Sequence, residues 1–146
     1  VWLPGTLGRL PDRQPGRRVL VMDDDEISRY LVRNHLAGAP FQIREAGGAT
    51  QGLRDARAEH PDAIILDLVM PEMSGFDVLA QLKQDPATMD IPVVILTSKA
   101  LSEEERRRLA PHALRVLSKQ ALADGAAVGE LRAALSNVNR REMDGG

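Results

Sequence analysis

The sequence contains no cysteine. Disulfides, zinc–thiolate sites and cysteine nucleophiles are therefore excluded, which suits a reducing compartment such as the cytoplasm. No apolar run approaches the about 20 residues that a membrane-spanning helix needs, so we expect no membrane insertion by this segment. A basic excess is also absent, because the formal net charge of the 146 residues is −2. Direct nucleic acid binding, which depends on neutralising phosphates, is not expected.

The chain is long enough for one domain with a substantial core. Proline and glycine recur through residues 1–16, which predicts a linker or the end of a preceding domain there. We expect the folded domain to cover residues 17–138 and residues 139–146 to form a C-terminal tail.

Five apolar segments have the patterns of β-strands. Most are short runs rich in Val, Ile and Leu, typical of strands buried on both faces of a parallel sheet. The second alternates apolar with polar residues, as an edge strand does. The predicted strands cover residues 18–22, 41–46, 63–66, 93–96 and 113–117.

Amphipathic segments separate these strands and predict five helices. The first is predicted from Ile27, Tyr30, Leu31 and residues 34–36, and the last follows the apolar stripe from Val128 to Val138. Five strands alternating with five helices predict an α/β fold, a doubly wound five-stranded parallel sheet.

The fourth predicted helix begins with a capping box, in which Ser102 is followed by Glu105. Beyond Leu101 and Leu109 it has little apolar material. We therefore expect this helix to be the most weakly held of the five.

Polar side chains follow the predicted strands where each one ends. In a doubly wound sheet, ligands bind beyond the carboxyl ends of the strands. Clustered carboxylates repel one another, and a divalent cation with oxygen ligands, such as Mg²⁺, relieves that repulsion. A lysine and a hydroxyl opposite the metal would suit a phosphoryl group. These strand-end residues are Asp23, Asp24, Asp25, Asp67, Thr97, Ser98, Ser118 and Lys119.

Several of these residues also have a simpler interpretation. Asp25 fits an N-cap of the following helix. Asp67 could be a turn residue, Lys119 a solvated surface lysine, and Thr97 the end of a strand, with Ser98 as a neighbouring substitute.

Four motifs together resemble the receiver domain of response regulators (CheY-like). They are VMDDDEISR after the first strand, DLVMPEMSG after the third, VVILTSKA at the fourth and LSK at the fifth. The resemblance covers about residues 17–138 and implies the flavodoxin-like (βα)5 arrangement with strand order 2-1-3-4-5.

The resemblance implies a role for each matching residue. Asp67 would be the phosphoacceptor, taking a phosphoryl group from a phosphohistidine. Mg²⁺ would be bound by Asp24, Asp67 and the backbone carbonyl of Val69, with Asp23 orienting a metal-bound water. Thr97 and Lys119 would contact the phosphoryl oxygens. Such a domain would catalyse its own phosphorylation and dephosphorylation.

Two positions depart from the family pattern. Val116 stands where many receivers have the Tyr or Phe that changes rotamer on activation, so a switch through an aromatic rotamer is not expected. Gln120 replaces the usual proline after the lysine, which predicts a trans Lys119–Gln120 bond because a cis bond without proline costs about 2.5–4 kcal/mol.

One alternative is a different enzyme class, the haloacid-dehalogenase-type phosphatases. Their nucleophilic aspartate and a second aspartate two residues later would be Asp23 and Asp25, again with Mg²⁺. This hypothesis gives Asp67 no role, and beyond Lys119 it finds only Asp124 for an expected acidic pair.

The wider protein admits two interpretations. The opening VWLP resembles the end of a histidine-kinase catalytic domain, and residues 116–135 resemble the receivers of hybrid kinases. We therefore expect a hybrid histidine kinase receiver, with a stand-alone single-domain response regulator as the alternative. The implied partner is a histidine kinase or histidine phosphotransfer protein, and the resemblance allows a weak homodimer. The expected location is cytoplasmic, with tethering to a membrane through a parent kinase as a variant.

Overall fold

Short apolar runs form the strands of the computed structural model, which describes residues 16–38 and 40–138. The expected linker and tail lie almost wholly outside the described residues. The strands are β1 (Arg17–Met22), β2 (Phe41–Ala46), β3 (Ala63–Leu66), β4 (Val93–Thr97) and β5 (Arg115–Ser118). The helices are α1 (Glu26–Leu36), α2 (Ala49–Glu59), α3 (Gly75–Gln84), α4 (Glu103–Leu109), α5 (Lys119–Ala123) and α6 (Val128–Ser136).

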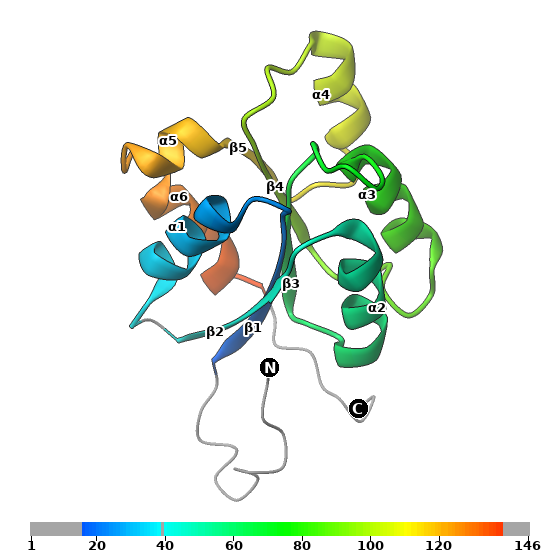
Figure 1. Cartoon of the computed structure of the whole chain (residues 1–146), viewed down its shortest axis with the longest axis horizontal. Coiled ribbons are helices and arrows are strands. Elements are labelled where there is room, and N and C mark those ends of the chain that lie inside the picture. Colours follow the sequence, from blue (N-terminus) through cyan, green and yellow to red (C-terminus); the bar gives the residue numbers. More distant parts are fainter. Residues whose placement is uncertain (1–15, 39, 139–146) are drawn as a thin grey trace, which may run out of the picture.

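The strands of the described residues form one parallel sheet in the order β2-β1-β3-β4-β5. This order confirms the predicted doubly wound, flavodoxin-like fold, with β2 at an edge as its alternating pattern indicated (Figure 1). Met22 at the end of β1 pairs with Leu66 at the end of β3. The residues that follow these two strands are thereby brought to the same edge of the sheet.

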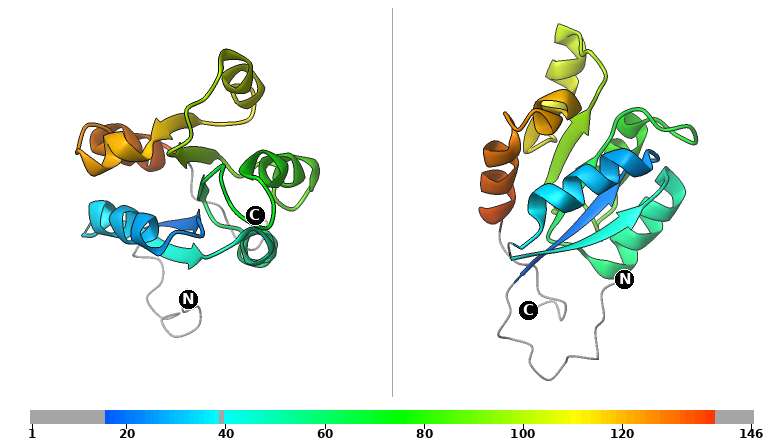
Figure 2. Two further views of the ribbon diagram at one scale, coloured as in Figure 1. Left: turned by 45° about the horizontal axis from the view of Figure 1, so that its top comes forward. Right: turned by 60° about the vertical axis from the view of Figure 1, so that its left-hand side comes forward.

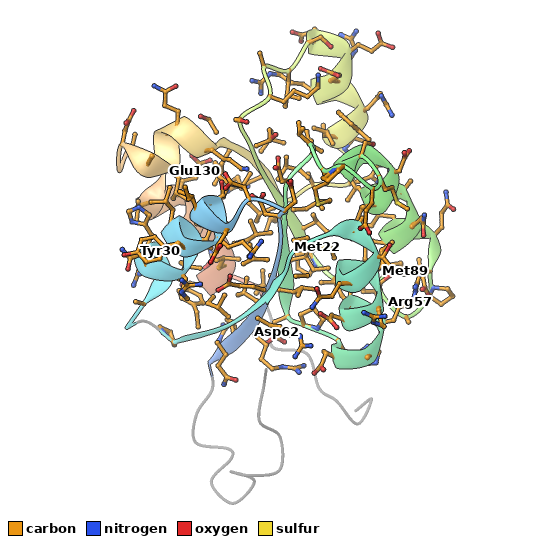
Figure 3. All side chains as sticks on the ribbon, in the orientation of Figure 1. Met22, Tyr30, Arg57, Asp62, Met89 and Glu130 are labelled. Carbon is orange, nitrogen blue, oxygen red and sulfur yellow. The ribbon has the colours of Figure 1, made fainter. Side chains whose placement is uncertain are left out.

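Helices cover both faces of the sheet (Figure 2). Successive strand residues point to opposite faces, so Leu20 and Met22 join the core under α2 and α3, whereas Val19 and Val21 join the core under α1 and α6. Figure 3 shows Met22 near the centre of the molecule. Within the described segments, every helix is too short or too polar to cross a bilayer.

The buried face of α1 differs from the prediction near the start of the helix, whereas Leu36 is buried as predicted. Ile27 and Tyr30 are 71% and 51% exposed, whereas Ser28, Val32 and Leu36 are buried. These buried positions are spaced four residues apart, which places them on one side of the helix. Figure 3 shows Tyr30 on the outer side of α1. The apolar residues near the start of α1 therefore lie on its exposed side.

A short helix that was not predicted, α5, follows β5 directly. The Ser118 side chain caps it by accepting a hydrogen bond from the Ala121 N–H at 3.1 Å, and Leu122 is buried beneath it. Gly125, at φ 86°, lies in the turn that separates α5 from α6. The five residues of α5 are too few to show a helical period. The Lys119–Gln120 bond is trans, as predicted, since no described peptide bond is cis.

The predicted capping box of α4 is present. Ser102 Oγ accepts from the Glu105 N–H at 3.1 Å, and Glu105 Oε1 accepts from the Ser102 N–H at 3.0 Å. Leu109 is the one buried residue of this helix, which stands away from the sheet (Figure 1).

Arg17, the first residue of β1, links the start of the sheet to the end of α6. Its Nε donates to the Val138 carbonyl at 2.9 Å, and its Nη2 donates to the Ser136 carbonyl at 3.1 Å. These carbonyls lie at the C-terminal end of α6, where backbone acceptors have no helical partner. The start of β1 is therefore fastened to the end of α6.

Candidate phosphoacceptor site

Three carboxylates meet at the carboxyl ends of β1 and β3. Asp23 follows Met22 and Asp67 follows Leu66, and the Asp67 N–H donates to the Met22 carbonyl at 3.1 Å. Oxygen atoms of Asp23, Asp24 and Asp67 all lie within 4.8 Å of one another. Asp23 and Asp67 are buried, whereas Asp24 is exposed. The cluster therefore opens to solvent on the Asp24 side.

Lys119, at the start of α5, bridges the two buried carboxylates. Its Nζ lies 2.9 Å from Oδ2 of Asp67 and 2.9 Å from Oδ2 of Asp23. Burial alone would lower the pKa of Lys119, but the hydrogen bonds to Asp23 and Asp67 outweigh it and the pKa is raised. For Asp23, burial dominates over the attraction of Lys119, and its pKa is also raised. Both effects follow from placing an acidic pair in a water-poor site with one cation.

Asp25 has a separate, structural role. Its side chain accepts from the Ile27 N–H at 3.1 Å and from the Ser28 hydroxyl at 2.9 Å, so it is the predicted N-cap of α1. The hydrogen bond from Ser28, followed by that from Ile27, lowers its pKa. The Asp25 N–H in turn donates to Oδ1 of Asp23 at 2.9 Å. The side chain of Asp25 thus caps α1, while its N–H binds the side chain of Asp23.

Thr97 ends β4 and is buried, with a relative exposure of 3%. Its hydroxyl oxygen accepts from the Lys99 N–H at 3.2 Å. The neighbouring Ser98 is exposed, and the Lys99 ammonium pairs with Glu105 of α4 at 3.3 Å. The end of β4 is therefore connected directly to the start of α4.

The segment from Asp67 to Gly75 approaches its own backbone closely. A Cβ added to Gly75 would lie 2.2 Å from the Asp67 carbonyl oxygen and 2.5 Å from the Leu68 Cα. Glycine at position 75 allows α3 to begin directly against the strand end. The same segment is tied to α2, because Glu72 accepts a hydrogen bond from the Thr50 N–H at 3.1 Å.

The acidic cluster suits a hard divalent cation. Oδ1 of Asp23 accepts from Asp25, and Oδ1 of Asp67 accepts from the Val69 N–H at 3.3 Å. Each carboxylate oxygen has more than one lone pair, so these contacts leave acceptor capacity. Asp24 adds an exposed carboxylate at the open side. Oxygen donors with space for water are what Mg²⁺ prefers.

Sequence reasoning missed three residues around this site, namely Arg29, Glu45 and Glu72. Arg29 and Glu45 lie on α1 and β2, and they meet only once the chain folds. Arg29 and Glu72 stood within the VMDDDEISR and DLVMPEMSG motifs, but neither was given a role.

Comparisons with known proteins identify relatives of this chain. The profile of the response regulator receiver domain matches residues 19–134. Protein PilH of Pseudomonas aeruginosa is 37% identical over 82 residues, which are 56% of this chain and 68% of PilH. Response regulator PleD of Caulobacter vibrioides is 40% identical over 81 residues, which are 56% of this chain and 18% of PleD.

Solved structures agree as well. The crystal structure of the N-terminal domain of a response regulator receiver protein from Methanoculleus marisnigri JR1 matches with a TM-score of 0.68 at 28% identity. That match covers 86% of this chain and 98% of the other chain. Since the profile spans well over half of the sequence, the chain belongs to the response regulator receiver domain family of two-component signalling.

Proposed function

We propose that this receiver takes a phosphoryl group from a phosphohistidine onto Asp67 in a Mg²⁺-dependent reaction. The observation that carries the proposal is the position of Lys119, 2.9 Å from both Asp67 and Asp23, beside a three-carboxylate cluster. The Asp67 carboxylate would be the nucleophile, and the Lys119 ammonium beside it would neutralise charge on the transferred group.

The chemistry is an in-line phosphoryl transfer. A carboxylate oxygen of Asp67 forms the new O–P bond while the P–N bond of the phosphohistidine breaks. The electron pair of that bond stays on the imidazole nitrogen. Lys119 would move from Oδ2 of Asp67 to a phosphoryl oxygen, and the Thr97 hydroxyl would donate to another. Positioning and charge neutralisation account for catalysis, so no general base is required.

The metal would be held by Asp24, Asp67 and the backbone carbonyl of Val69, with Asp23 acting through a water. Bound Mg²⁺ would supply neutralisation of the charge that develops on the transferred group. The raised pKa of Asp23 supports this arrangement, because a buried carboxylate beside two others is stabilised in its charged form by a cation.

Phosphorylation would signal by a conformational change that does not use an aromatic rotamer. The position on β5 where many receivers have Tyr or Phe is occupied here by Val116. Movement of the Thr97 hydroxyl toward the phosphoryl group would release the hydrogen bond from the Lys99 N–H. Lys99 also pairs with Glu105, which favours α4 as the responding element.

We infer that the partner is a histidine kinase or a histidine phosphotransfer protein, and that the reaction takes place in the cytoplasm. The VWLP resemblance favours a hybrid histidine kinase as the parent protein, with a stand-alone response regulator as the alternative. The residues that carry this resemblance lie outside the described ones. The sequence of the encoding gene decides between the two, because only a hybrid kinase has a kinase catalytic domain encoded upstream of residue 1.

The phosphatase alternative has less support. It requires Asp25 as a second catalytic carboxylate, but Asp25 accepts hydrogen bonds from Ile27 and Ser28 as the cap of α1. It also requires Asp23 to react, although the salt bridge from Lys119 is shared equally with Asp67.

Incubation with acetyl phosphate and Mg²⁺, followed by intact-protein mass spectrometry, tests the proposal. Wild type should gain one phosphoryl group and Asp67→Asn none. Asp77→Asn, which changes an exposed carboxylate in the first turn of α3, is the matched control and should react like wild type. Equal modification of Asp67→Asn and wild type would refute Asp67 as the phosphoacceptor. Hydrolysis of a small phosphate ester that requires Asp23 but not Asp67 would support the phosphatase instead.

A further inference from the structure

Arg29 of α1 contacts both the acidic loop and the edge strand. Its Nη1 donates to the backbone carbonyl of Asp23 at 2.7 Å, and its Nε donates to Oε1 of Glu45 on β2 at 3.0 Å. The Arg29 side chain is only 17% exposed. Glu45 also pairs with Arg33, one turn further along α1. Arg29 is therefore held between a strand and the backbone of the loop that bears the acidic residues.

The hydrogen bond to the Asp23 carbonyl bears on Asp24. The carbonyl of Asp23 and the N–H of Asp24 belong to one planar peptide unit. Holding this carbonyl restricts rotation of the plane, and with it the position of the Asp24 Cα from which the side chain extends. Asp24 is exposed, so its carboxylate depends on the backbone for its aim toward the cluster.

The position of Asp23 itself is fixed by other contacts. Its N–H donates to the Ala46 carbonyl at 3.1 Å, and its Oδ1 accepts from the Asp25 N–H at 2.9 Å. These contacts hold the residue at the end of β1 and its side chain, whereas the Arg29 contact holds its carbonyl. Loss of Arg29 would therefore free the peptide between Asp23 and Asp24 while leaving the Asp23 side chain bound.

We propose that Arg29 is a positioning residue that orients the Asp23–Asp24 peptide for metal binding, with Glu45 holding the guanidinium in place. This inference rests on the proposed Mg²⁺ site. It concerns a residue that does not itself contact the metal, so Arg29 acts through Asp24. Partners of this kind, which orient the ligands of a metal, typically change metal affinity 10–100-fold when removed.

The charge of Arg29 alone would have the opposite effect on Mg²⁺ binding. Arg29 is a cation near a site that would bind another cation, and like charges repel. If charge alone mattered, Arg29→Ala would strengthen Mg²⁺ binding. If Arg29 orients the Asp24 carboxylate, the same substitution weakens it. The direction of the change distinguishes the two roles.

The experiment is a calorimetric titration of the whole chain with MgCl₂, with thermal unfolding measured on the same samples. Arg29→Ala should weaken Mg²⁺ binding about tenfold. Arg33→Ala is the matched control, because it removes the other Glu45 partner without touching Asp23, and it should bind Mg²⁺ like wild type. For modification by acetyl phosphate, Arg29→Ala should need a higher Mg²⁺ concentration to reach its half-maximal rate. At saturating Mg²⁺ its rate should equal that of wild type.

Arg29→Lys serves if Arg29→Ala does not fold. A lysine keeps the charge, but its single ammonium cannot reproduce the two-sided fork of arginine, so Mg²⁺ binding should again weaken several-fold. Unchanged or tighter Mg²⁺ binding in the folded variant, whatever its melting temperature, would overturn the positioning role while leaving the metal site intact. Absence of Mg²⁺ binding by wild type would overturn the proposed site and this inference together.

Discussion

Lys119 Nζ lies 2.9 Å from Oδ2 of Asp67. One carboxylate oxygen of the proposed phosphoacceptor is therefore hydrogen-bonded before any phosphoryl group arrives. In this state the lysine neutralises the carboxylate that is expected to react. Phosphoryl transfer would replace one partner of the ammonium by another of greater negative charge. The cation that would contact the phosphoryl group is therefore in place before the reaction.

Replacing Lys119 by methionine should destabilise the metal-free protein. Asp23 and Asp67 are buried and would face each other without a cation, and removing one partner of a buried ion pair costs about 3–5 kcal/mol. Urea unfolding at neutral pH measures the loss. Adding Mg²⁺ or the second substitution Asp23→Asn should restore much of it. A Lys119→Met variant as stable as wild type without Mg²⁺ would contradict the role of this ion pair.

The ion pair also predicts a dependence of stability on alkaline pH. The pKa of Lys119 is raised above its ordinary value of 10.5 in the folded state. Its contribution is therefore fully present below pH 10.5 and is lost as the pH rises through the raised value. The difference in unfolding free energy between wild type and Lys119→Met should stay constant from neutral pH up to pH 10.5 and shrink above it. A difference that begins to shrink near neutral pH would argue against the raised pKa.

Gly75→Ala should disturb both the fold and the site. The new Cβ would lie 2.2 Å from the Asp67 carbonyl oxygen, and backbone atoms cannot yield as a flexible side chain does. We expect a loss of about 1–3 kcal/mol in unfolding free energy, with shifted NMR signals at Asp67. Gly129→Ala is the control, since a Cβ at this α6 position meets nothing within 4 Å. It should gain about 0.5–1 kcal/mol, and equal effects at the two glycines would be incompatible with the close approach.

Helix α4 should exchange its amide hydrogens faster than α3. The N–H groups of Arg106 and Ala110 are hydrogen-bonded within α4, but Leu109 is the one buried side chain beneath them. In α3, Val78, Leu79 and Leu82 are buried, and opening that helix exposes more apolar surface. Hydrogen exchange followed by NMR measures both. Similar protection in α3 and α4 would show that α4 is held by more than its few contacts.

Asp24→Asn should weaken Mg²⁺ binding without unfolding the protein. Asp24 is exposed, so its replacement removes no buried contact, while an amide is a poorer ligand for Mg²⁺ than a carboxylate. Calorimetric titration and thermal unfolding without metal test the two halves. Glu26→Gln, which removes an exposed charge at the start of α1, should leave Mg²⁺ binding nearly unchanged. Equal Mg²⁺ affinities of Asp24→Asn and wild type would remove Asp24 from the proposed ligands.

The sheet could be predicted from sequence because most strands are separate apolar runs and the second alternates apolar with polar residues. Helix faces were harder, since Ile27 and Tyr30 of α1 are apolar but lie on its exposed side. Burial there depends on how the helix sits on the sheet, which the helical period of a short segment does not specify. The acidic residues were found because they follow strand ends. Their supports were not, because the contact between Arg29 and Glu45 joins residues from different elements.

The clamp of Arg17 on the end of α6 has a consequence for how this receiver can be joined to other proteins. The start of β1 and the end of α6 lie at one end of the sheet (Figure 1), whereas Asp67 follows the carboxyl end of β3, at the opposite end. Segments attached at either end therefore start on the side away from the carboxylates. A protein fused at either end should therefore leave the proposed phosphoacceptor site accessible to its proposed phosphohistidine donor.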